Sequence, residues 1–117
     1  MTEMVFREMT AEITSSVASG GSIEAPGVAK CTHMNHFTPM EPRMATEIAH
    51  AVTGMSRKEA NQIVKKLLDK YERHIPDPPV GKKYAECWDI KLKAPSPEYV
   101  DLYKKVKKEL RDVGIPL

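Results

Sequence analysis

The chain has 117 residues, of which 29% are charged and 41% are hydrophobic, with a formal net charge of +2. This length is typical of one domain, and so small a net charge does not by itself indicate nucleic-acid binding. No apolar run approaches the ~20 residues that span a membrane, and two cysteines are too few for a secreted disulfide scaffold. We expect a single cytoplasmic segment over 1–117 with reduced thiols.

Residues 1–20 are expected to form a helix and its cap. An apolar stripe recurs there at helical spacing, and its members are Phe6, Met9, Ile13 and Val17. Glu3 and Arg7 stand four positions apart, which is a weakly favourable ion-pair spacing on a helix. Residues 21–37 are expected to form a loop, because they contain glycine and proline and show no sustained period.

A helical hairpin is expected over 38–74. Thr38 and Glu41 match a capping box at its start, although Pro42 also permits a regular helix that begins later. A second capping box, S-R-K-E, starts the following helix after the short joint G-M-S. Because the joint is so short, the two helices are predicted to run antiparallel to one another.

Residues 75–96 begin with I-P-D-P-P-V-G, which predicts a stiff, Pro-rich connector, and continue into a short turn. Ser96 and Pro97 then match the cap and first position of a C-terminal helix over 97–117, with Gly114 near its end. No segment indicates a β-strand. The expected fold class is mainly α, with several amphipathic helices joined by long loops.

The candidate metal ligands are Cys31, His33 and His36, which lie within six positions of one another. Thiolate and imidazole are ligands that zinc prefers, and Glu41 or Cys87 could complete such a site. Structural zinc sites usually pair two short ligand clusters, however, and this chain has only one. We interpret the cluster as a polar surface loop and keep zinc binding as the weaker alternative.

Other candidate sites are weaker still. The basic stretch over 104–111 is interrupted by buried-stripe and acidic residues, so we interpret it as a solvated helix face and expect no nucleic-acid or membrane partner. Cys87 is expected to be a small buried thiol beside Trp88. The sequence has no Gly-rich phosphate loop and no recognisable catalytic triad or carboxylate pair. No catalytic or cofactor-binding residue is predicted.

A family resemblance is carried by three stretches in fixed order: TPMEPRMATEIAHAVTGMSRKEANQIVKKLLDKYE, PPVGKKYAECWDIK and PSPEYVDLYKKVKKELRDVGI. Together they resemble the C-terminal end of the monomethylamine methyltransferases. These archaeal enzymes transfer a methyl group from methylamine to a corrinoid protein. The resemblance covers nearly all of this chain but only about the last quarter of the family's length.

The resemblance implies the C-terminal part of a TIM-type barrel, whose active site lies at the C-terminal ends of the strands. It implies methyl transfer to corrinoid cobalt in methanogenesis from methylamines, with the corrinoid carried by a partner protein and no cofactor bound directly here. The family's pyrrolysine matches no position of this sequence, so no catalytic residue is carried over.

Two functional hypotheses follow from this sequence. In the first, the chain is a fragment or subunit of the methyltransferase, inactive alone, that works with the remaining barrel, the corrinoid protein or further copies of itself. This hypothesis predicts exposed apolar helix faces. In the second, the chain is an independent small helical protein that self-associates or binds a partner, and it predicts a stable fold without help.

Overall fold

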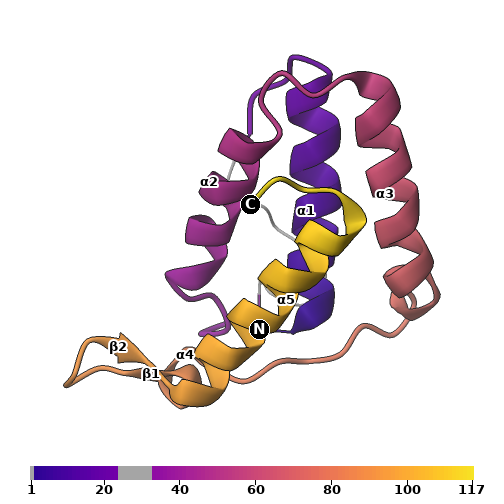
Figure 1. The fold of residues 1–117 in the computed structure, drawn as a ribbon. Coiled ribbons are helices and arrows are strands. Elements are labelled where there is room, and N and C mark those ends of the chain that lie inside the picture. The colour runs from indigo at the N-terminus through magenta and orange to yellow at the C-terminus, as the bar shows by residue number, and fades with distance from the viewer. Residues whose placement is uncertain (1, 24–32) are drawn as a thin grey trace.

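The structure is a computed structural model, and it describes residues 2–23 and 33–117. This part of the chain contains five α-helices, one 3-10 helix and one two-stranded hairpin (Figure 1). Their bounds are α1 Glu3–Ala18, α2 Met40–Ala51, α3 Arg57–Tyr71, η1 Glu72–His74, α4 Tyr84–Cys87, β1 Trp88–Asp89, β2 Ala94–Pro95 and α5 Pro97–Val113. The expected mainly-α class is confirmed.

Helix α1 is the central element of the bundle. Helices α2 and α3 both pack against it, and α5 crosses the bundle to contact α1 and α3 (Figure 1). Helices α2 and α3 run in opposite directions across their short joint, yet each makes most of its contacts with α1. In the described structure α1 therefore lies alongside both members of the predicted helical hairpin.

Local capping signals fix where the helices begin and end. The side chain of Thr2 caps α1, and Ser56 and Glu59 form the predicted reciprocal capping box of α3. Ser96 caps α5. Gly114 has φ of 118°, a left-handed conformation that glycine adopts at little cost, and it ends α5 as the sequence predicts.

A single hydrophobic core joins the long helices. The largest fully buried apolar side chains within these helices are Phe6, Met9 and Ile13 on α1, Met44 and Ile48 on α2, Leu67 on α3, and Val106 and Leu110 on α5; Val52 and Ile115, just beyond α2 and α5, are buried as fully. The rings of Phe6 and Tyr103 meet edge to face with centroids 6.0 Å apart, which ties α1 to α5. None of the described helices is long and apolar enough to cross a membrane.

The expectation of exposed apolar helix faces is wrong for the described chain. Its exposed large apolar side chains are Ile23, Met34, Phe37, Ile75, Val80, Ile90 and Leu92. All of these lie in connecting segments or in the hairpin loop. The apolar stripes of the four long helices are directed at one another, because α1 offers a surface to α2, α3 and α5 at once.

The sequence did not indicate the hairpin. Strands β1 and β2 pair antiparallel, with Trp88 opposite Pro95 and Asp89 opposite Ala94. Each strand has only two residues, which is too short to produce the alternating pattern by which strands are identified. Its loop depends instead on hydrogen bonds from one side chain, described below.

Candidate functional site

Two members of the candidate metal cluster, His33 and His36, lie side by side, with ring centroids 5.9 Å apart. The ring of His36 is buried, and its Nδ1 lies 2.9 Å from the carbonyl oxygen of Met34. Cys31 lies outside the described residues. Within residues 2–23 and 33–117 no group of three or more His, Cys, Asp or Glu side chains is placed to hold a metal ion. The polar surface loop therefore stays the prediction for this segment, and zinc binding stays the weaker alternative.

A buried carboxylate lies at the start of α2. Glu41 is only 1% exposed, and its Oε2 accepts hydrogen bonds from the backbone N–H of Thr38, at 3.0 Å, and from the Thr38 hydroxyl. Its Oε1 accepts a hydrogen bond of 3.0 Å from the hydroxyl of Tyr99. Burial and then the charge of Glu41 raise the pKa of Tyr99, so Tyr99 stays protonated as a donor.

These contacts join the loop before α2 to the first turn of α5. The contact between Thr38 and Glu41 has the capping-box spacing seen in the sequence, but only the half in which Glu41 accepts from the Thr38 N–H forms. The N-cap of α2 is Pro39, and no side chain caps the helix as predicted. The contact with Tyr99 has no such spacing, because Tyr99 is 58 positions from Glu41. Helix α2 begins at Met40, so Pro42 falls in the first turn, where backbone N–H groups have no intrahelical acceptor. Pro42 therefore does not delay the start of α2.

A second polar cluster joins α1, α3 and α5. The guanidinium of Arg7 contacts Glu109 at 2.9 Å and Glu3 at 2.8 Å, the latter pair having the spacing noted in the sequence. Lys70 contacts the same Glu109 carboxylate at 2.9 Å. The hydrogen bond from Arg7, followed by that from Lys70, lowers the pKa of Glu109 to about 2 against the penalty of burial. Glu109 therefore stays charged, and its ion pairs link α1, α3 and α5.

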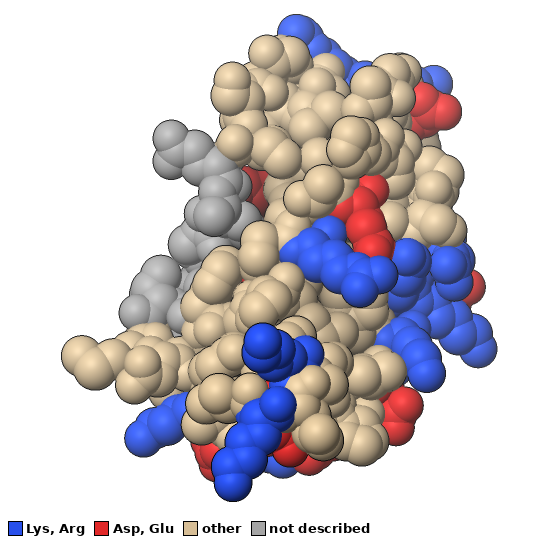
Figure 2. All heavy atoms as spheres, turned by 90° about the vertical axis from the view of Figure 1, so that its left-hand side faces the viewer, with Lys and Arg blue, Asp and Glu red and all other residues tan. Residues whose placement is uncertain are grey.

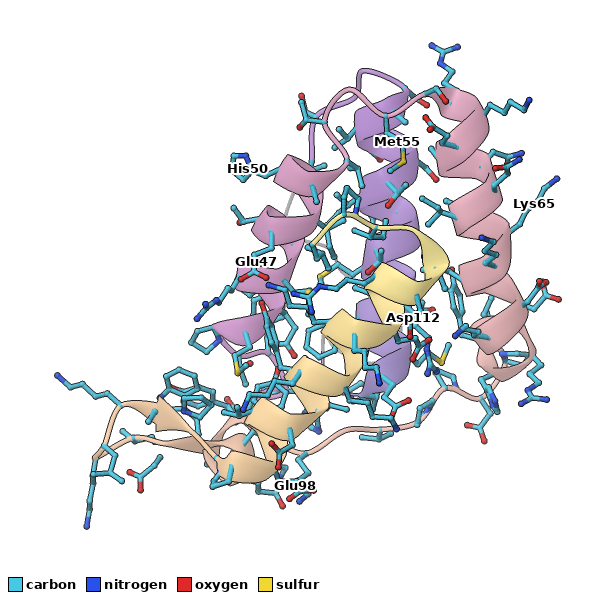
Figure 3. The ribbon with its side chains drawn as sticks, viewed as in Figure 1. Glu47, His50, Met55, Lys65, Glu98 and Asp112 are labelled. Carbon is cyan, nitrogen blue, oxygen red and sulfur yellow. The ribbon has the colours of Figure 1, made fainter. Side chains whose placement is uncertain are left out.

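The basic residues of α5 are partly neutralised by acidic neighbours. Lys105 pairs with Glu3, and Lys107 lies 2.6 Å from Glu47 of α2, which Figure 3 labels. On the face that Figure 2 shows, Lys and Arg form separate groups beside carboxylates, with broad uncharged surface between them. Lys104, Lys105, Lys108 and Arg111 are exposed, which agrees with a solvated helix face over 104–111.

The thiol of Cys87 borders a hollow of about 330 Å³ between the connector and α5. Val80, Tyr99 and Leu102 contribute to its lining, and Glu98, labelled in Figure 3 at the start of α5, stands at the same hollow. Cys87 is 3% exposed, and burial raises the pKa of its thiol. Nucleophilic cysteines need a lowered pKa, so Cys87 has the character of a packing residue, as its sequence context indicates.

These contacts define a helical module held together by its own core, in which the described polar clusters serve the fold. The family model described as "Monomethylamine methyltransferase MtmB" matches residues 1–115. The chain belongs to the monomethylamine methyltransferase MtmB family.

Individual relatives agree with this assignment. Monomethylamine methyltransferase MtmB1 of Methanosarcina barkeri is 36% identical over 115 residues, which are 97% of this chain and 25% of the relative. MtmB1 of Methanosarcina acetivorans and MtmB of Methanosarcina mazei match with the same identity and coverage. The chain thus spans about a quarter of the length of these curated relatives.

Solved structures match as well. The crystal structure of the Methanosarcina barkeri enzyme superposes with a TM-score of 0.89 at 36% identity, over 99% of this chain and 26% of that one. A crystal structure of a hydroxylamine complex of MtmB gives the same values. The resemblance read from the three sequence stretches is therefore confirmed at the level of the family and of the local fold.

Proposed function

We propose that this chain supplies the C-terminal helical part of a monomethylamine:corrinoid protein methyltransferase. The whole enzyme transfers a methyl group from monomethylamine to the cobalt of a corrinoid that a partner protein carries, a step of methanogenesis from methylamines in the archaeal cytoplasm. The observation that carries this proposal is the joint agreement of sequence and backbone, with 36% identity and a TM-score of 0.89 over 99% of the chain.

Within that enzyme the chain has a supporting role and does not catalyse methyl transfer alone. Catalytic power comes largely from charged groups and dipoles preorganised in a site that excludes water. The buried carboxylate of Glu41 is instead engaged by Thr38 and Tyr99, and that of Glu109 by Arg7 and Lys70. We propose that the reacting groups come from the rest of the methyltransferase and that the corrinoid stays on its own protein.

The closed core favours one alternative function. Because the long helices cover their own apolar faces, the chain has what an independent small helical protein needs to fold. Such a protein would self-associate or bind a partner without taking part in methyl transfer. The two proposals differ in what accompanies the chain in its host.

The decisive experiment isolates the protein from its host and determines the native mass and the polypeptides of the assembly. The methyltransferase proposal expects a large assembly that contains the remaining barrel and that methylates a corrinoid protein when monomethylamine is added. The chain alone, in the same assay, should give no methylation. A small homo-oligomer of this chain only, without monomethylamine-dependent methylation, would overturn the proposal in favour of the alternative.

A further inference from the structure

The hairpin over 88–95 projects from the side of the helical body (Figure 1). Its loop is held by Asp89, whose Oδ1 accepts hydrogen bonds from the backbone N–H groups of Lys91, at 2.8 Å, and Leu92, at 2.9 Å. Lys93 takes a left-handed conformation with φ of 52° and returns the chain to β2. The loop is therefore ordered before anything binds it, which lowers the entropic cost of docking.

Residues 90–93, here named the hairpin tip, alternate apolar and basic side chains. Ile90 is 64% exposed and Leu92 is 76% exposed, which leaves both without cover from the helical body. Lys91 and Lys93 are also exposed and give the tip two positive charges. Ile90 and Leu92 thus place two uncovered apolar side chains on one ordered projection, which association with another surface would bury.

The base of the hairpin is braced by ring and backbone contacts. The ring of Trp88 stacks on that of Tyr84, with centroids 6.1 Å apart and an interplanar angle of 18°. The backbone N–H of Tyr84 donates a hydrogen bond of 2.5 Å to the carbonyl oxygen of Asn35, so the loop before α2 lies against α4. That loop carries two further exposed apolar side chains, Met34 and Phe37, close to the contact.

We propose that the hairpin tip docks on the remaining polypeptide of the methyltransferase, the three quarters of the relatives' length that this chain does not span. The receiving surface has an apolar socket for Ile90 and Leu92 and carboxylates beside it for Lys91 and Lys93. This inference rests on the proposed function, because that function supplies the occupant.

The hairpin is the expected docking surface because the helices bury their own apolar faces in the core. The described helices of this module cover their apolar stripes with one another, so they offer little uncovered apolar area to the rest of the enzyme. The tip offers apolar side chains that are exposed, ordered and held away from the body. Because the tip is positively charged, the surface that receives it should carry carboxylates beside the apolar socket, since like charges across an interface are unfavourable.

The test compares two variants in the assembly isolated from the host. Leu92→Asp places a carboxylate in the apolar socket, and Ile75→Asp is the matched control. Ile75 is 50% exposed and directly follows η1 at the C-terminal end of α3. In Figure 1 helix α3 and the hairpin lie on opposite sides of the molecule. For both variants we would measure the native mass of the assembly and the rate of amide hydrogen exchange at the hairpin tip. Thermal melting of each isolated variant chain checks that it is folded.

The inference expects the tip to exchange at least tenfold more slowly in the assembly than in the chain alone. Leu92→Asp should lose this protection and release the chain, whereas Ile75→Asp should behave as the unaltered protein, and all three should melt alike. Normal assembly and protection of Leu92→Asp would overturn the hairpin inference while the proposed function stands. A homo-oligomer that Leu92→Asp dissociates would make a second copy the occupant and would overturn both.

Discussion

Replacing Tyr99 by phenylalanine removes one hydroxyl from the centre of the molecule and leaves the ring in place. That hydroxyl donates a hydrogen bond of 3.0 Å to Glu41, which is 1% exposed. A hydrogen bond to a charged group contributes about 1.5–3 kcal/mol, and a buried acceptor left with one donor fewer loses most of that value. We expect Tyr99→Phe to lower the free energy of unfolding by about 2 kcal/mol.

Thermal unfolding converts this loss into a measurable shift. One kcal/mol moves the midpoint by ~4–8 °C in domains of 60–100 residues and by ~2–4 °C in domains of 150–250 residues. A chain of 117 residues lies between these classes, so Tyr99→Phe should lower Tm by roughly 6–10 °C. Circular dichroism or calorimetry of the purified chain at neutral pH measures the difference directly.

The matched control is Tyr103→Phe, one turn further along α5. Tyr103 is 7% exposed, and its hydroxyl lies near Glu47 and Arg43 without a well-formed hydrogen bond to a described atom. Burial and then the charge of Glu47 raise its pKa. Removing a hydroxyl that makes no well-formed hydrogen bond should lower Tm far less than Tyr99→Phe does, or leave it unchanged. Equal losses in the two variants, or a loss below about 2 °C for Tyr99→Phe, would refute the reasoning from buried hydrogen bonds.

Three further predictions concern acid, thiol reactivity and metal. The pKa of Glu109 is about 2 in the folded chain against an ordinary 4.5. The ionised carboxylate therefore stabilises the fold by an amount on the order of 2 kcal/mol above pH 4.5, and this stabilisation is lost as pH falls toward 2. Urea unfolding at a series of pH values should show the loss in the unaltered chain and not in Glu109→Gln. In Cys31→Ser, the remaining thiol of Cys87 should react with Ellman's reagent only as fast as the chain unfolds, and immediate labelling would contradict its burial. Dialysed protein should hold far less than one zinc per chain, whereas one equivalent that disappears in His33→Ala/His36→Ala would establish a metal site.

The sequence predicted those features that depend on neighbouring residues. The start of α3 at Ser56 and the start of α5 at Ser96 follow from capping, because the cap and the N–H group that it accepts from lie within three positions. The hydrogen bond from Tyr99 to Glu41 was not predictable, because only the tertiary fold brings the first turns of α5 and α2 together. The hairpin was missed for another reason: the side chain of Asp89 holds its loop, and the strands carry no pattern of their own.

The apolar stripes were read correctly as buried faces, but the sequence could not say what buries them. A stripe on one helix has the same appearance whether a neighbouring helix of the same chain or another polypeptide covers it. Here α1 contacts three helices, which is enough to cover the stripes without a partner. The surface left for association is therefore small and lies in connecting segments, where sequence periodicity gives no signal.

The closed core also decides how a failed activity assay can be interpreted. If the chain alone unfolds in one cooperative transition, then its lack of methyl transfer reflects missing catalytic groups and not a collapsed structure. If it unfolds gradually and binds hydrophobic dyes, the core needs the rest of the enzyme after all, and the independent-protein alternative loses its physical basis. Cooperative unfolding of the isolated chain is thus compatible with both proposed functions. Only the polypeptides that are associated with the chain in its host distinguish the two functions.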